Sequence, residues 1–148
     1  MKKLLFLLVA TCYLFSGCKK DTLPDDFVYR EYPSLSPSDL NLRDDQKNTL
    51  IVINDQRAFE AIFTYPERLM PVDFDKYTLL LVAGTENTPF KTIYSEVIRE
   101  DNGQYRVKLS ILFGGNYWTV VTPYQRAFVI PKTRAEDVSL EIDRYQQI

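Results

Sequence analysis

The chain has 148 residues, of which 45% are hydrophobic and 26% are charged, with a formal net charge of −2, two cysteines and no histidine. This composition fits one globular domain and excludes a disordered chain, and the small net charge gives no general attraction to nucleic acid. The absence of histidine removes the commonest metal ligand and the usual base that activates serine and cysteine nucleophiles.

The N-terminal segment has the pattern of a bacterial lipoprotein signal. A basic start precedes an almost unbroken apolar run over residues 4–15, which is too short to cross a bilayer and is typical of a signal-peptide core. The following Phe15-Ser16-Gly17-Cys18 resembles a lipobox, in which the cysteine becomes the lipidated first residue of the mature chain. We therefore predict a signal peptide over residues 1–17, cleavage between Gly17 and Cys18, and diacylglyceryl and palmitate groups on Cys18. The alternative is an ordinary secretory signal followed by an unrelated cysteine.

Lipidation would decide where the mature protein resides. Two or more acyl chains hold a protein durably on a membrane. We expect an outer-membrane protein that is held by its lipid, faces either the periplasm or the cell surface, and spans nothing. Cys12 would be lost with the signal and Cys18 would carry lipid, so the mature chain would hold no thiol for a disulfide, a nucleophile or a metal site.

The mature chain divides into two regions by composition. Residues 18–45 contain more acidic than basic side chains, three prolines and little apolar periodicity, which predicts an acidic tether. Within this tether, the alternative for Phe27-Val28-Tyr29 is that it docks onto the domain as an edge strand. Residues 46–148 are predicted to form a β-rich globular domain.

The first half of this domain is expected to contain two strands with a short helix between them. The β-branched run Thr49–Ile53 predicts a buried strand. Asn54 or Asp55 can cap a helix whose apolar side chains share one face, namely Phe59, Ile62 and Phe63. The run Tyr77–Ala83 is apolar on both faces, so it should be a central strand that ends at Gly84.

The second half of the domain is expected to be made of strands alone. Residues 90–99 and 105–113 predict a hairpin that turns at Asp101-Asn102-Gly103, and further strands are predicted within 117–121, 126–131 and 138–142. The order of elements predicts a mainly β (α+β) fold, a small antiparallel β-sandwich or barrel-like domain with one short helix.

Two groups of residues invite a functional interpretation. Asp73 and Asp75 are spaced as paired catalytic carboxylates or calcium ligands would be, although two solvated aspartates beside a strand explain them more simply. The aromatic side chains Tyr117, Trp118 and Tyr124 follow a Gly-Gly step and are candidates for a contact surface for a glycan, a small ligand or a protein. Burial of Trp118 in the core is the alternative.

A third group is basic. Arg106, Lys108 and Arg126 are predicted on strand surfaces, and cross-strand ion pairs with Glu96 and Glu100 explain them better than nucleic-acid binding. No pattern in the sequence predicts a catalytic residue, a metal site or a cofactor.

A family resemblance rests on two further motifs. The run Leu79-Leu80-Leu81-Val82-Ala83-Gly84 and the later Pro123-Tyr124-Gln125-Arg126-Ala127-Phe128-Val129-Ile130-Pro131 resemble the C-terminal domain of PrcB-like protease-complex lipoproteins. Where that family usually has a Gly-Gly-Tyr-like step, this chain has Glu86-Asn87-Thr88-Pro89-Phe90. The resemblance implies a non-catalytic lipoprotein that stabilises an envelope protein complex, with a surface protease as one case. We therefore expect a lipid-anchored interaction module with an envelope protein partner, and glycan or small-ligand binding is the alternative.

Overall fold

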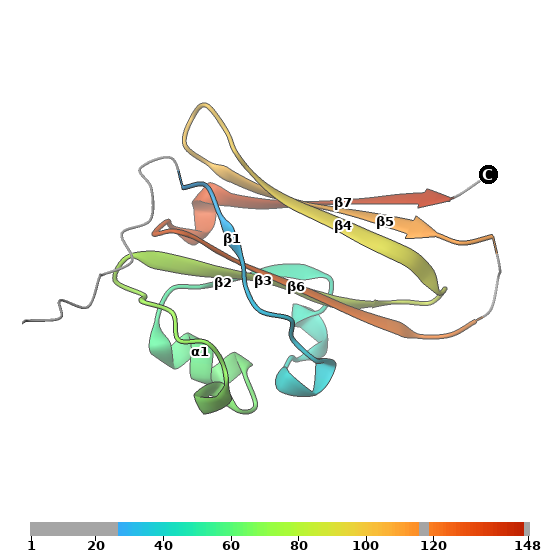
Figure 1. Ribbon diagram of the computed structural model, residues 1–148, viewed down its shortest axis with the longest axis horizontal. Helices are drawn as coiled ribbons and strands as arrows, with labels where there is room; N and C mark the ends of the chain where they lie inside the picture. The colour runs from blue at the N-terminus through green and yellow to red at the C-terminus, as the bar shows by residue number, and fades with distance from the viewer. Residues whose placement is uncertain (1–26, 116–118, 147–148) are drawn as a thin grey trace, which may run out of the picture.

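The computed structural model describes residues 27–115 and 119–146, which form two β-sheets and a layer of helical turns (Figure 1). The four-stranded sheet has the order β1-β6-β3-β2, and the three-stranded sheet has the order β4-β5-β7. Their strands are β1 (Arg30–Glu31), β2 (Thr49–Ile53), β3 (Tyr77–Glu86), β4 (Phe90–Arg99), β5 (Tyr105–Phe113), β6 (Thr122–Pro131) and β7 (Val138–Gln146). The helical elements are α1 (Gln56–Ile62) and the 3-10 turns Pro37–Asp39, Asp44–Gln46, Pro66–Arg68 and Ala135–Asp137.

The four-stranded sheet lies in the middle of the molecule and is covered on both faces (Figure 1). Alternate residues of its central strand β3 point to opposite faces, so Leu80 and Val82 pack against the three-stranded sheet while Leu79 and Leu81 pack against the α1 layer. Burial on both faces explains why the β3 sequence is a continuous apolar run rather than an alternating one. The prediction of a central strand is confirmed.

Helix α1 begins and packs as its sequence predicts. The Asp55 carboxylate accepts a hydrogen bond from the Ala58 amide at 2.8 Å and so caps the first turn. Phe59, Ile62 and Phe63 are buried together against the four-stranded sheet. The short helix is therefore held by tertiary packing, which a helix of this length requires.

The predicted hairpin is confirmed over β4 and β5. Its turn is closed by a hydrogen bond from the Gly103 amide to the Glu100 carbonyl, and Gly103 has a φ of 83°, a conformation that favours glycine. The next strand of this sheet, β7, pairs with β5 in parallel, because the chain crosses to the other sheet to form β6 before it returns. The mainly β (α+β) prediction is confirmed as a sandwich, and the two sheets do not close into a barrel.

Five predicted boundaries need correction, two of them because β6 begins at Thr122 rather than at residue 126 and β7 continues to Gln146 rather than ending at residue 142. The part of the predicted tether that the structure describes, residues 27–45, packs on the domain: β1 pairs with β6, and Tyr32 and Leu35 are buried in the core. Isolated apolar residues among prolines and serines gave no periodicity to reveal this. Strand β3 continues through Gly84 to Glu86 because β6 pairs with it along its whole length. The described end of the predicted 117–121 strand, residues 119–121, is irregular, and Val120 and Val121 are exposed.

Candidate functional site

The lipidation and aromatic candidates lie largely outside the described residues. Gly17, Cys18, Tyr117 and Trp118 all do, so their predicted roles stay predictions. Tyr124 is described and is only 3% exposed, packed between the two sheets. Its ring therefore offers no surface to a glycan or a protein.

Tyr124 belongs instead to a polar contact at one end of the sandwich. Its hydroxyl donates to the Asn48 side-chain oxygen at 2.9 Å, and the Thr85 amide donates to the same oxygen at 3.3 Å. That oxygen sits where a side chain of residue 84 would be, because a Cβ placed on Gly84 would lie 1.8 Å from it. Burial raises the pKa of Tyr124, and the nearby Glu86 carboxylate raises it further. The cluster is structural, since it joins β2 to β3 and β6.

The paired aspartates are engaged in local structure. The Asp73 carbonyl accepts hydrogen bonds from the amides of Lys76 and Tyr77, and its carboxylate accepts one from the Asp75 amide. Phe74, between them, packs against Phe59 with a ring separation of 5.8 Å. Among residues 27–115 and 119–146, no group of three or more acidic or cysteine side chains could hold a metal ion. The arrangement therefore matches the simpler interpretation of two aspartates that shape a turn.

Two of the three basic candidates form an ion-pair ladder on the outer face of the three-stranded sheet. Arg106 contacts Glu100 at 2.8 Å and Glu141 at 2.9 Å, while Lys108 contacts Glu141 and Asp143, each at 3.3 Å. The carboxylate of Glu100 is the main cause that raises the pKa of Arg106. Of the three acidic partners, Glu141 and Asp143 belong to β7, which pairs with one side of β5, and Glu100 directly follows β4 on the other side.

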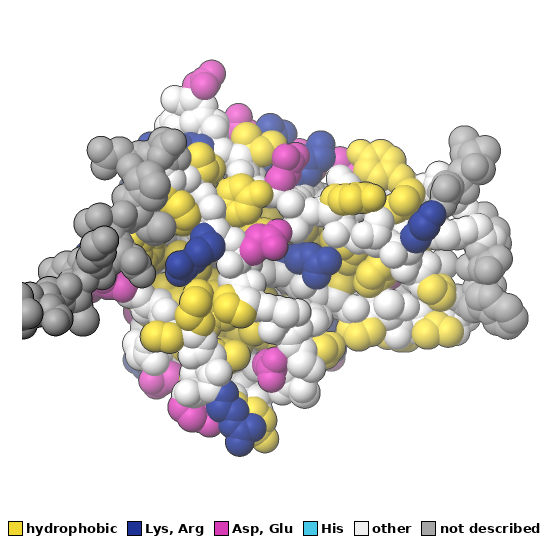
Figure 2. All heavy atoms as spheres, viewed as in Figure 1, with side chains coloured by type: hydrophobic (Ala, Val, Ile, Leu, Met, Phe, Trp, Pro, Cys, Tyr) yellow, Lys and Arg dark blue, Asp and Glu magenta, His cyan; other side chains and the backbone are white. Residues whose placement is uncertain are grey.

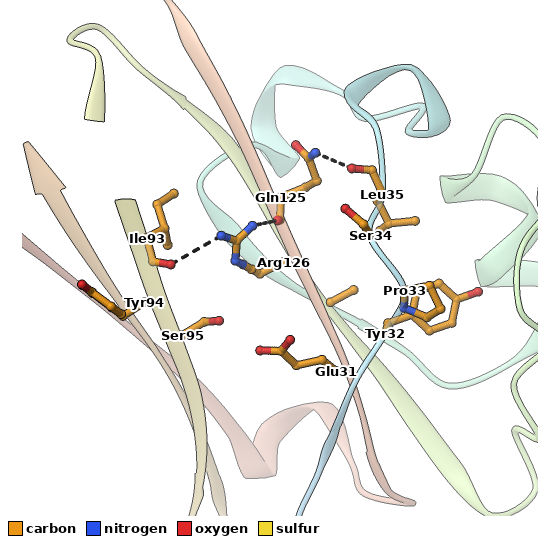
Figure 3. A pocket seen from close by; sticks show the side chains of 11 residues that line it. Glu31, Tyr32, Pro33, Ser34, Leu35, Ile93, Tyr94, Ser95, Gln125 and Arg126 are labelled. Carbon is orange, nitrogen blue, oxygen red and sulfur yellow. Dashed lines mark hydrogen bonds between the residues drawn. The ribbon is translucent and has the colours of Figure 1, made fainter. Parts of the chain in front are cut away.

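Arg126 departs from the predicted pairing. Its guanidinium reaches from β6 across to β4, donating to the Gln125 carbonyl at 2.8 Å and to the Ile93 carbonyl at 3.4 Å (Figure 3). Within the described part of the chain it forms no ion pair with a carboxylate. Arg126 is the one basic candidate whose charge is not neutralised in this way.

Arg126 lines a groove of about 490 Å³ between β4 and the segment that follows β1. The groove is mostly polar, and its opposite wall carries Glu31 and Ser34 while β4 contributes Tyr94 and Ser95. In Figure 3, the side chains of Ser95 and Glu31 point toward each other across it. Figure 2 shows acidic and basic side chains interspersed on this face of the molecule, without a large patch of one charge.

The groove cannot be located from the sequence. Its walls come from segments that are distant in the chain, and the status of β4 as an edge strand depends on the whole strand order. The only available signal was the basic residue Arg126 in an otherwise apolar strand.

In the described ranges, none of the helices is both long and apolar enough to span a membrane.

Comparisons with protein-family models, with curated proteins and with solved structures give no match for the chain. The resemblance to PrcB-like lipoproteins therefore stays a prediction carried by its motifs alone.

Proposed function

We propose that this protein is a non-catalytic interaction module that is anchored to the bacterial outer membrane by lipid on Cys18. The lipobox-like segment supports the anchor. The observation that carries the interaction role is the uncovered side of the sandwich, where the edge strand β4 runs beside the groove. Tyr94 on this strand is 64% exposed, an amphipathic ring of the kind that dominates protein contacts.

The side chains gathered on the outer sheet face support binding rather than chemistry. The charges of Arg106 and Lys108 are neutralised by neighbouring carboxylates. Neither side chain of this ladder is therefore available as a base or a nucleophile. The partner that we propose is another envelope protein, and the PrcB-like resemblance makes a protease complex the first candidate.

The anchor is tested by metabolic labelling with an alkyne analogue of palmitate. The wild-type protein should take up the label and fractionate with the outer membrane, whereas Cys18→Ser should do neither. Label on the Cys18→Ser protein, or a wild-type chain without label, would refute the lipid anchor.

The interaction role is tested by a photo-crosslinking amino acid, benzoylphenylalanine, in intact cells. We would place it at Tyr94 on β4 and, as the matched control, at Tyr65, which is 46% exposed on the α1 side of the molecule. We expect a discrete crosslinked product from position 94 and a weaker one, or none, from position 65. If position 94 gives no product at native abundance under several growth conditions, the proposed function is wrong.

A further inference from the structure

The backbone of β4 has an edge with no partner strand among the described residues. In an antiparallel ladder, residues that face the partner strand alternate with residues that face away. The Glu100 amide donates to the Gln104 carbonyl on the β5 side, so the even-numbered residues of β4 face β5. The backbone amides and carbonyls of the odd-numbered residues therefore point to the open edge, while their side chains point between the two sheets. The hydrogen bond from Arg126 to the Ile93 carbonyl agrees with this backbone direction. Ser95, Val97 and Arg99 thus direct their amides and carbonyls to the open edge.

The middle of this edge lacks the usual protection against strand pairing. Edge strands are normally blunted by proline, by inward-pointing charges, by bulges or by a covering element. In β4 the register irregularity lies between Phe90 and Thr92, at the start of the strand, and the Ile93 carbonyl accepts from Arg126. The segment from 94 to 97 contains no proline and no inward charge. An unprotected edge of this length is suited to pairing with an added strand.

The facing edge of β6 is mostly closed, so a strand that lies in this groove pairs with β4. On β6 the Ala127 carbonyl is taken by the Tyr32 amide, the Gln125 carbonyl is taken by Arg126, and Pro123 has no amide hydrogen. The groove between β6 and β4 separates this closed edge from the open one. A strand lying in the groove would find its backbone partners on β4.

The charge in the groove indicates what such a strand carries. Arg126 is partly buried and donates to backbone carbonyls, and it forms no ion pair with a carboxylate of the described residues. Glu31 lines the opposite wall of the same groove without pairing with it. A charge in a partly desolvated site is stabilised by an opposite charge. In an added strand, every second side chain would point inward between the two sheets. Such an inward side chain would contact the Arg126 guanidinium.

We propose that the free edge of β4 binds an extended segment of the partner protein as an added strand, with an acidic side chain of that segment paired to Arg126. This inference rests on the proposed interaction function and names its site. Backbone hydrogen bonds to Ser95 and Val97 supply affinity, and the carboxylate at Arg126 sets register and specificity. Outward side chains of the added strand would contact Tyr94 on the outer sheet face.

A second copy of the chain fits this edge less well. Antiparallel pairing of β4 with itself about Ser95 would set Lys91 opposite Arg99, and like charges directly opposite each other are destabilising. It would also bring no acidic residue to the inward positions, which are Ile93, Ser95 and Val97.

The test uses the full-length protein in mild detergent and a library of ten-residue peptides, displayed on phage, with alternate positions randomised. We expect the selected peptides to carry Asp or Glu at an alternating position. Replacing that acid by its amide should weaken binding to the wild type about tenfold, and the same replacement should change binding to Arg126→Gln less than twofold. Arg57→Gln, which removes an exposed positive charge on α1, is the matched control and should bind as the wild type does.

The backbone component is tested with Ser95→Pro. The Ser95 amide faces the free edge, so proline removes a donor from the groove without breaking a bond to β5. This variant should lose peptide binding while Ser95→Ala keeps it, with circular dichroism checking that both variants fold. A peptide methylated on its pairing amides provides the same test without altering the protein.

Each outcome bears on the proposal. Selected peptides without acids, or peptides that bind Ser95→Pro and Arg126→Gln as tightly as the wild type, would overturn it. A wild-type dimer that dissociates in Ser95→Pro would also overturn it, because a second copy would then occupy the edge. If the crosslink from position 94 persists in cells carrying Ser95→Pro or Arg126→Gln, the interaction function stands and this site assignment fails.

Discussion

Gly84→Ala should destabilise the domain through one identifiable clash. The added Cβ would lie 1.8 Å from the Asn48 side-chain oxygen, 2.7 Å from its Cγ and 2.9 Å from the Tyr124 hydroxyl. Real Cβ atoms do not approach other atoms so closely, so the Asn48 side chain must leave its position. Its hydrogen bonds with the Tyr124 hydroxyl and the Thr85 amide would then break.

The magnitude follows from these two hydrogen bonds and from the volume of the added methyl group. Each hydrogen bond contributes roughly 1 kcal/mol, and forcing a methyl group into a packed site costs about 1 to 3 kcal/mol. We expect Gly84→Ala to reduce the free energy of unfolding by about 3 to 5 kcal/mol, the sum of the two lost hydrogen bonds and the cost of the methyl group. That corresponds to a fall in melting temperature of roughly 15 °C for a domain of this size.

The assay is urea unfolding followed by circular dichroism, applied to a double-mutant cycle. Asn48 has a φ of 59°, which glycine adopts without strain, so Asn48→Gly removes the obstructing side chain with little cost to the backbone. The double variant Asn48→Gly/Gly84→Ala should therefore be more stable than Gly84→Ala alone. Gly114→Ala is the matched control, because no atom lies within 4 Å of its added Cβ.

Additivity would refute this reasoning. If the double variant loses the sum of the two single losses, Asn48 is not the group that residue 84 must avoid. A loss in Gly114→Ala as large as that in Gly84→Ala would instead point to a general effect of removing glycine.

Four further outcomes are expected. Burial raises the pKa of Tyr32 from 10.0 to about 12. The free energy of unfolding should therefore keep the full contribution of the protonated hydroxyl below pH 10.0 and lose it as the pH rises toward 12. In urea unfolding, Tyr32→Phe should flatten this pH dependence. Phe128→Ala, at a fully buried position between the sheets, should cost about 3 to 5 kcal/mol by the same assay, and a loss under 1 kcal/mol would contradict the packing. Asp55→Ala should cost about 1 kcal/mol through the lost helix cap, whereas Asp55→Asn should recover most of it. Glu141→Gln should cost at most about 1 kcal/mol, and this cost should shrink in high salt, since its ion pairs are partly exposed.

The features that sequence patterns predicted are local ones. Strand β2 matches its predicted bounds because a β-branched run needs no distant partner to be recognised, and the hairpin was marked by alternation on both sides of a glycine turn. The helix was predictable because Asp55 and the apolar residues of its buried face lie within three turns of one another.

The features that were missed depend on distant pairing. The segment after residue 27 docks because Tyr32 finds a core formed by α1 and the middle sheet, and its hydroxyl donates to the Met70 carbonyl. The open edge of β4 follows from the return of β7 to the far side of β5. Arg126 was predicted to form a cross-strand ion pair, and only the relative position of the two sheets shows that it spans a groove instead.

The pairing of β3 with β6 also constrains the order in which the chain can fold. β3 is covered by β2 on one edge early in synthesis, but its other edge stays open until the whole β4–β5 hairpin and the loop after it have been made. Contacts between such distant segments form slowly, because the intervening chain must be ordered first. During that interval the most apolar strand of the protein is exposed, so the unfinished chain depends on protection from aggregation that the finished fold no longer needs.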